Sequence, residues 1–102
     1  MTDDYCELYF EIATELEKAT GIPRFEWGFG SAVARTIAAH PDLRGYWCRT
    51  VEADGGMEVC CEVVGTGGVR WHCQHENEGF ARLVAMRNAL REVGPIRVEK
   101  TG

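Results

Sequence analysis

The stretch YWCRTVEADGGMEVCCEVVGTGGVRWHCQH, which begins at Tyr46 and ends at His75, decides the fold. It contains three strand-like runs separated by two glycine-rich connectors. The runs are 46–52, 57–64 and 69–75. The connectors hold Asp-Gly and Gly-Gly pairs, which mark hairpin turns because glycine adopts a positive φ at no steric cost. The stretch therefore predicts a three-stranded antiparallel meander.

The register of this sheet follows from the lengths of its turns. A two-residue turn at Asp54 and Gly55 places Cys48 opposite Cys61, and a three-residue second loop places Cys73 opposite Cys61. One face of the sheet is then apolar and is expected to form the core. That face carries Tyr46, Cys48, Met57, Val59, Cys61, Val63, Trp71 and Cys73. The other face, which includes Trp47, Arg49, Glu58, Glu62 and His72, is mostly solvent-facing.

Helical patterns flank the meander on both sides. Apolar residues recur every three or four positions in 3–20 and again in 78–93, which predicts two amphipathic helices. A shorter helix is expected at 31–39, and a short edge strand at 96–98. We therefore predict an α+β fold in the order α-α-β-β-β-α, with the N-terminal and C-terminal helices on one face of the sheet.

The loop at 22–30 is rich in aromatic residues. Phe25, Trp27 and Phe29 alternate along it, a pattern that also suits a short strand. Gly21 and Pro23 end the helix before the loop, because glycine accepts the left-handed conformation and proline cannot continue a helix.

Composition limits the classes of function. The 102 residues predict a single domain spanning 1–102, and 45% hydrophobic with 26% charged residues excludes wholesale disorder. No apolar run reaches the length of a membrane span. The net charge of −5 argues against direct binding of nucleic acid, whose phosphates attract basic proteins. We expect neither nucleic acid nor membrane as a direct partner.

The five cysteines are an odd number, and the opening residues lack the features of a secretion signal. We therefore expect free thiols in the core and a cytoplasmic location. The alternative is a zinc or thiol site built from Cys48, Cys61 and Cys73 with a histidine. These three residues lack Cys-x-x-Cys spacing, and His72 points to the opposite face from Cys73.

Catalytic motifs are absent from the sequence. Cys60 and His72 share the outer face of the predicted sheet, but a flat sheet face makes a poor pocket for a nucleophile and its base. The glycine-rich turns match no phosphate-binding loop. We expect a protein that is not an enzyme and needs no cofactor.

The first helix carries the most informative charges. Asp4, Glu7, Glu11 and Glu15 lie on one helical face, and like charges at this spacing destabilise a helix by roughly 0.2–0.5 kcal/mol per pair. We expect them to form a continuous anionic ridge, which is either a solvated face or a surface for an Arg- and Lys-rich protein.

Three aromatic residues, Trp27, Phe29 and Trp47, are further candidates for contact with a partner. We expect at least two of them to lie in the core. The predicted partner-binding residues are Asp4, Glu7, Glu11, Glu15 and Trp47.

The order helix, three-stranded meander, helix resembles the double-stranded RNA-binding domain over most of the chain. That family binds RNA with basic residues at the start of its last helix, where this chain has Asn77, Glu78 and Gly79. A divergent RNA-binding domain is therefore a further alternative only.

The chain also resembles the small acidic proteins of phages and mobile elements, including anti-CRISPR proteins. The shared features are its length, its net negative charge, its acidic first helix and the ending from Trp71 to Val93. That resemblance implies a non-enzymatic inhibitor that blocks a basic surface of a larger protein or ribonucleoprotein complex. Pairing of two copies through an edge strand is a further expectation.

Overall fold

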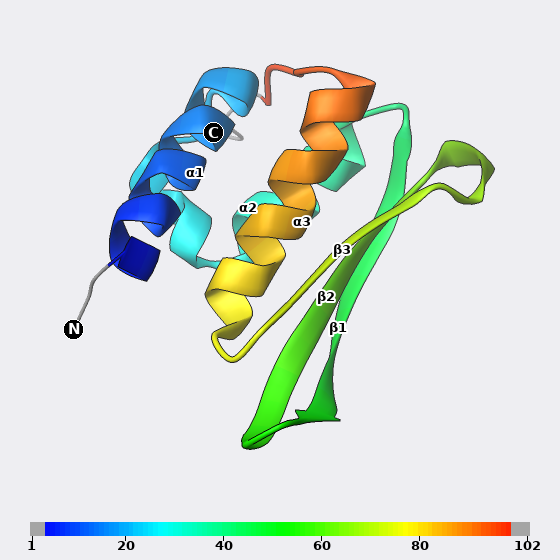
Figure 1. The fold of residues 1–102 in the computed structure, drawn as a ribbon. Helices are drawn as coiled ribbons and strands as arrows, with labels where there is room; N and C mark the ends of the chain where they lie inside the picture. Colours follow the sequence, from blue (N-terminus) through cyan, green and yellow to red (C-terminus); the bar gives the residue numbers. More distant parts are fainter. Residues whose placement is uncertain (1–3, 99–102) are drawn as a thin grey trace.

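The computed structural model describes the backbone of residues 4–98, with side chains from Cys6 onward, and shows an α+β fold (Figure 1). Along the chain the elements are α1 (Asp4–Thr20), the 3₁₀ helix η1 (Arg24–Gly28), α2 (Gly30–Ala39), β1 (Leu43–Ala53), β2 (Gly56–Gly65), the 3₁₀ helix η2 (Thr66–Gly68), β3 (Arg70–His75) and α3 (Glu78–Val93). The predicted class and element order are confirmed.

The sheet has the strand order β1-β2-β3, and both pairings are antiparallel. Cys48 lies opposite Cys61, and Cys61 lies opposite Cys73, as the turn lengths predicted. Gly55 has a φ of +86° in the first turn and Gly67 a φ of +82° in the second. Residues other than glycine rarely adopt a positive φ. The two glycines therefore determine where each turn lies, and the position of the turns sets the register of the strands.

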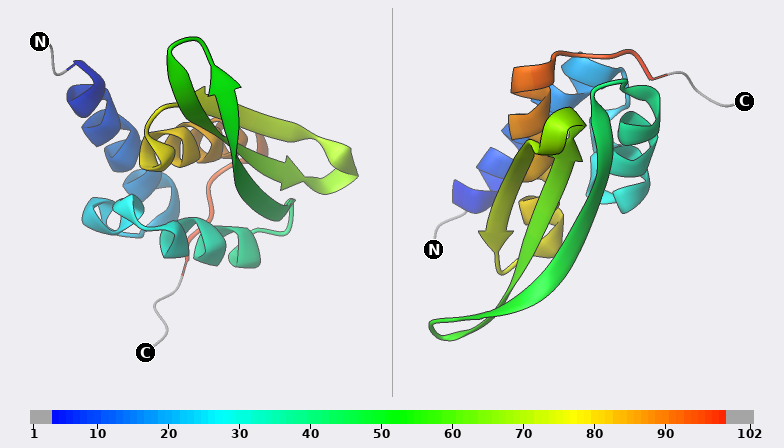
Figure 2. Two further views of the ribbon diagram at one scale, coloured as in Figure 1. Left: turned by 90° about the horizontal axis from the view of Figure 1, so that it is seen from below. Right: turned by 90° about the vertical axis from the view of Figure 1, so that its right-hand side faces the viewer.

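The helices lie on one side of the sheet (Figure 2). The last helix, α3, packs against β2 and β3, while α2 packs against β1. The first helix, α1, packs against α3 and η1. The opposite face of the sheet carries no helix from residues 4–98, and we call it the open sheet face.

The core lies between the helices and the sheet. Its largest fully buried apolar side chains are Ile12, Leu16, Trp27, Val33, Val63, Leu83 and Met86. They come from α1, η1, α2, β2 and α3, so each of these elements contributes to a single apolar cluster. Burial of such side chains is the main favourable contribution to folding.

The first helix ends at Gly21, whose φ of +84° is the predicted left-handed stop. The predicted edge strand at 96–98 is wrong. The backbone N–H groups of Ile96 and Val98 donate to the carbonyls of Ala19 and Thr20, at 2.9 and 2.8 Å. The last carbonyls of a helix have no partner within the helix, and residues 96–98 supply two of the missing donors.

Candidate functional site

Two of the predicted partner-binding residues lie exposed on α1. Glu7 and Glu11 are one helical turn apart, and neither has an ion pair or hydrogen bond with any residue of the described chain. We call them the acidic pair. Asp4 begins the helix, but its side chain lies outside the part of the chain that the structure describes.

Glu15 does not belong to a free anionic ridge. The guanidinium of Arg91 on α3 donates two hydrogen bonds to its carboxylate, at 2.7 and 2.8 Å. This hydrogen bonding and the charge of Arg91, helped by the charge of Arg87, lower the pKa of Glu15 below its ordinary value, although partial burial opposes the shift. The expected continuous ridge therefore does not extend to Glu15, because α3 brings an arginine to this fourth carboxylate.

An apolar groove runs beside the acidic pair. It has a volume of about 500 Å³ and lies between α1 and η1. Its lining consists of Cys6, Tyr9, Phe10, Ala13, Arg24, Phe25 and Gly28. Phe10 follows Glu7 by three residues and precedes Glu11 by one, so it lies on the helix surface between the acidic pair and the groove. We call this hollow the α1–η1 groove.

The aromatic side chains of the groove are unusually open to solvent. Phe25 is 75% exposed and Phe10 is 56% exposed. The guanidinium of Arg24 lies 4.8 Å from the centre of the Phe10 ring and 3.7 Å from the carboxylate of Glu17. The positive charge of Arg24 is thus paired with a carboxylate, whereas the carboxylates of the acidic pair have no cation beside them among the described residues.

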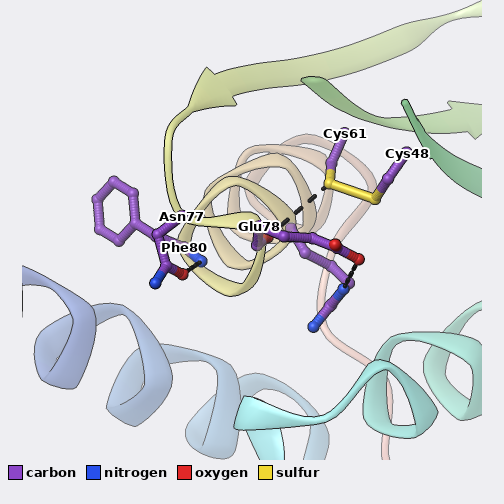
Figure 3. Close-up of a disulfide and its surroundings, with 6 residues drawn as sticks. Cys48, Cys61, Asn77, Glu78 and Phe80 are labelled. Atoms are coloured by element: carbon purple, nitrogen blue, oxygen red, sulfur yellow. Dashed lines mark hydrogen bonds and ion pairs between the residues drawn. A yellow bond between two sulfur atoms is a disulfide. The ribbon is translucent and has the colours of Figure 1, made fainter. Parts of the chain in front are cut away.

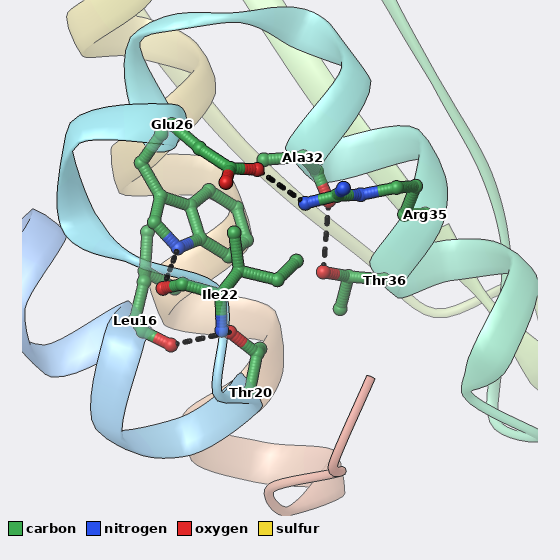
Figure 4. Close-up of polar contacts among 8 residues, drawn as sticks. Leu16, Thr20, Ile22, Glu26, Ala32, Arg35 and Thr36 are labelled. Atoms are coloured by element: carbon green, nitrogen blue, oxygen red, sulfur yellow. Dashed lines mark hydrogen bonds and ion pairs between the residues drawn. The ribbon is translucent and has the colours of Figure 1, made fainter. Parts of the chain in front are cut away.

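Trp27 anchors the η1 wall of the groove. This side chain is fully buried, and its indole N–H donates to the carbonyl of Ile22 at 3.2 Å. Arg35 of α2 donates to the carboxylate of Glu26 at 2.7 Å, which ties η1 to α2 (Figure 4). With one indole in the core and one ion pair to a neighbouring helix, η1 holds a fixed position beside α1.

The expectation that two of the three candidate aromatic residues lie in the core is wrong. Trp27 is buried, but Phe29 is 65% exposed and Trp47 is 37% exposed. In a strand Phe25, Trp27 and Phe29 would share one face, whereas the observed 3₁₀ helix turns Trp27 inward and leaves its neighbours outside.

Trp47 does not join the acidic pair. It precedes Cys48, whose side chain faces α3, so alternation along the strand places Trp47 on the open sheet face. There the guanidinium of Arg49 lies 5.4 Å from its ring. The sheet therefore separates Trp47 from the surface of α1.

The expectation that all cysteines are free thiols is wrong for one pair. Cys48 and Cys61 form a disulfide between β1 and β2, with their Cα atoms 4.1 Å apart (Figure 3). Two cysteines directly opposite each other on antiparallel strands are close enough to form a disulfide. The odd number of cysteines in the chain does not exclude one such pair. The sulfur of Cys61 lies 3.9 Å from the carbonyl oxygen of Glu78, at the start of α3.

The zinc alternative is weakened by this bond, since two of its three sulfur ligands are joined to each other. No group of three or more His, Cys, Asp or Glu side chains in the described part of the chain is arranged to hold a metal ion. Cys6, Cys60 and Cys73 are free thiols. Burial, with a smaller contribution from Cys60, raises the pKa of the Cys73 thiol, and Arg87 opposes the rise.

The residues that would bind RNA in the resembling family are engaged here in local structure. The side chain of Asn77 accepts a hydrogen bond from the backbone N–H of Phe80 and caps α3. The carboxylate of Glu78 pairs with Arg82 at 2.9 Å. The start of α3 thus places an acidic side chain where that family places cations.

The sequence reasoning missed the α1–η1 groove and its exposed side chains, Phe10 and Phe25. Two signals were present: Phe10 lies beside the apolar stripe of α1, and the loop at 22–30 holds three aromatic residues within five positions.

Comparison of the chain with known protein families, curated proteins and solved structures gives no match. Within the described residues, no helix combines the length and the apolar character that crossing a membrane requires.

Proposed function

We propose that this chain is a non-enzymatic protein-binding domain that blocks a basic surface of a larger nucleic-acid-handling complex. The observation that carries the proposal is the acidic pair, Glu7 and Glu11, which lies beside exposed Phe10 and has no ion pair among residues of the described chain. Unpaired charge next to exposed aromatic side chains is the combination that protein interfaces use for orientation and anchoring. An inhibitory role of the anti-CRISPR kind agrees with the small size and the net charge of −5.

The carboxylates act mainly on the rate and the specificity of association. A partner whose surface attracts nucleic acid is positive, and opposite charges steer the two surfaces together. A domain docked there excludes the nucleic acid sterically. Because exposed charges are screened by salt, we expect the binding to weaken as ionic strength rises.

The test compares two variants with the same change in charge. Glu7→Lys/Glu11→Lys reverses the acidic pair, while Glu52→Lys/Glu92→Lys reverses two other exposed glutamates on β1 and α3. Each immobilised protein is used to capture partners from a cell extract, and the captured protein is then tested for release of labelled nucleic acid. We expect wild type and the control to capture the same protein and to displace its nucleic acid. The acidic-pair variant should do neither.

Equal capture by all three proteins would contradict the role of the acidic pair. Capture of a partner that keeps its nucleic acid when the domain is added would contradict the blocking mechanism. Circular dichroism of each variant checks that the fold is unchanged.

A further inference from the structure

We propose that the α1–η1 groove is an anchor pocket for an amphipathic helix of the partner, which inserts an apolar side chain and sets Lys or Arg residues against the acidic pair. This inference rests on the proposed function and specifies the chemistry of the segment that is bound. Helices that dock in apolar grooves present their anchors on one face, one or two turns apart.

The shape of the groove suits such a side chain. Its two walls are α1 and η1, and its volume of about 500 Å³ lies in the range of small-ligand pockets. Phe10 projects from one wall and Phe25 from the other, and both are more than half exposed. Aromatic side chains in this position offer a large apolar contact area, and they lose little conformational entropy on binding because they have few rotamers.

The charges around the groove select a basic partner. Among the described lining residues, Arg24 is the one cation, and it is already paired with Glu17. Glu7 and Glu11, at the border next to Phe10, have no ion pair with any residue that the structure describes. Their Cα atoms are about 6 Å apart along the helix axis, because each residue of an α-helix rises 1.5 Å. Cations four residues apart on a partner helix have the same spacing.

A second copy of this chain is a poor occupant for the same reason. In a two-fold symmetric contact through α1, the same patch of both subunits meets. The carboxylates of Glu7 and Glu11 would then lie close to those of the other copy, and like charges across an interface oppose association. The charge pattern therefore favours a basic helix over self-association.

The test uses designed helical peptides of known composition. One labelled peptide contains only leucine and lysine in an amphipathic pattern, and a second has glutamate in place of every lysine. Binding to the full chain is measured by fluorescence anisotropy. We expect the leucine–lysine peptide to bind and the leucine–glutamate peptide not to bind. Failure of the leucine–lysine peptide to bind would overturn the inference.

Phe25 and Phe29 provide a matched pair of variants. Both are exposed phenylalanines near the same turn, but only Phe25 lines the groove. We expect Phe25→Ser to weaken binding of the leucine–lysine peptide by about 10- to 100-fold, as loss of an aromatic anchor does. Phe29→Ser should leave binding within about twofold, since a surface side chain away from the contact contributes little. Equal effects of the two variants would overturn the inference.

Gly28 offers a second way to close the groove without removing an aromatic ring. A Cβ built there meets the hydroxyl of Tyr9 at 3.4 Å and no other atom within 4 Å, so the backbone leaves room for the first atom of a side chain. We expect Gly28→Leu to fill the groove and to weaken peptide binding to a similar extent. Thermal unfolding of each variant verifies that the fold is retained.

The outcomes separate this inference from the proposed function. If charge reversal of the acidic pair abolishes partner capture while Phe25→Ser has no effect on the peptide, the groove inference fails alone. If light scattering shows a dimer of the wild type that Phe25→Ser dissociates, the occupant is a second copy and the inference is wrong.

Discussion

The surface of α1 and the open sheet face both display aromatic and charged side chains, but they differ in how their charges are balanced. On the sheet, Arg70 pairs with Glu62 at 3.1 Å, and the amide of Gln74 donates to Glu58 at 3.0 Å. On α1, the carboxylates of the acidic pair have no partner within the described chain. The carboxylates of Glu58 and Glu62 on the sheet therefore have partners within the fold, and those of the acidic pair have none among the described residues.

The difference originates in geometry. In an antiparallel sheet, residues of neighbouring strands lie side by side, and the diagonal neighbours Glu62 and Arg70, like Glu58 and Gln74, come close enough to pair within the fold. On a helix, residues four apart are neighbours, and Glu7 and Glu11 have the same sign. A charged face alone thus says little about function. Charge that the fold leaves unbalanced beside exposed apolar groups is more informative.

Of the changes considered, substitution of Trp27 is expected to have the largest effect on the α1 surface. Replacing it with alanine removes the buried indole that fixes η1, and we expect a loss of about 3–5 kcal/mol in the free energy of unfolding. The groove beside α1 should lose its second wall at the same time. Denaturant titration measures the stability, and anisotropy with the leucine–lysine peptide measures the groove.

Trp27→Phe is the milder companion, because it keeps a buried ring while it removes the hydrogen bond to Ile22 and part of the aromatic volume. We expect a loss of about 1 kcal/mol for that bond, with some further cost of the smaller ring. If the alanine variant were as stable as wild type, Trp27 would not anchor the groove.

An intermediate effect is expected from the disulfide on the sheet side of the molecule. The bond between Cys48 and Cys61 closes a loop with a sequence separation of 13 residues. Loops of this length restrict the unfolded chain by about 3 kcal/mol. We expect the Cys48→Ala/Cys61→Ala variant, or wild type under a reductant, to lose about that much stability.

This loss should leave the other surface unaffected. The acidic pair and the α1–η1 groove lie on α1 and η1, and the disulfide joins β1 to β2. Peptide binding at temperatures well below unfolding should therefore be the same in reduced and oxidised protein. A reductant that weakened binding without unfolding the chain would show that the two surfaces are coupled.

The smallest effect concerns Glu15, the carboxylate that the fold itself neutralises. Its pKa is lower in the folded chain than its ordinary value, so the ion pair with Arg91 stabilises the fold above the ordinary glutamate pKa. That stabilisation is lost as the pH falls through the folded pKa. We expect Glu15→Gln to be slightly less stable than wild type at neutral pH, and the difference to vanish in acid.

Glu11→Gln is the matched control, since Glu11 is exposed and has no partner among the described residues. Denaturant titrations of both variants between neutral and acid pH make the comparison. A larger loss for Glu11→Gln than for Glu15→Gln would reverse the assignment of paired and unpaired carboxylates.

The fold could be predicted from the sequence because its signals are local. The glycines of the two tight turns set the register, and the apolar periodicity of α1 and α3 set their inward faces. These features depend on residues a few positions apart. Turn glycines and apolar periodicity therefore favour the same turns and the same buried helix faces, whatever the packing of distant segments.

The site could be predicted only in part, because its deciding contacts join distant residues. Glu15 meets Arg91 across 76 positions, and Ile96 reaches back to Ala19. The groove depends on how η1 packs beside α1. The spacing of apolar residues along the sequence does not indicate this packing. The predicted register placed Cys48 opposite Cys61, but the odd number of cysteines led to the expectation of free thiols, and the bond between the two sulfurs appears only in the structure.

The hydrogen bonds from Ile96 and Val98 to the end of α1 have a consequence for synthesis of the chain. The first helix emerges from the ribosome long before its last two acceptors can be occupied. It also lacks α3, against which it packs, until translation has passed residue 93. Within residues 4–98, the end of α1 is therefore completed only after residues 96–98 have been made, and nascent chains arrested before residue 96 should be more sensitive to proteases than chains extended past residue 98.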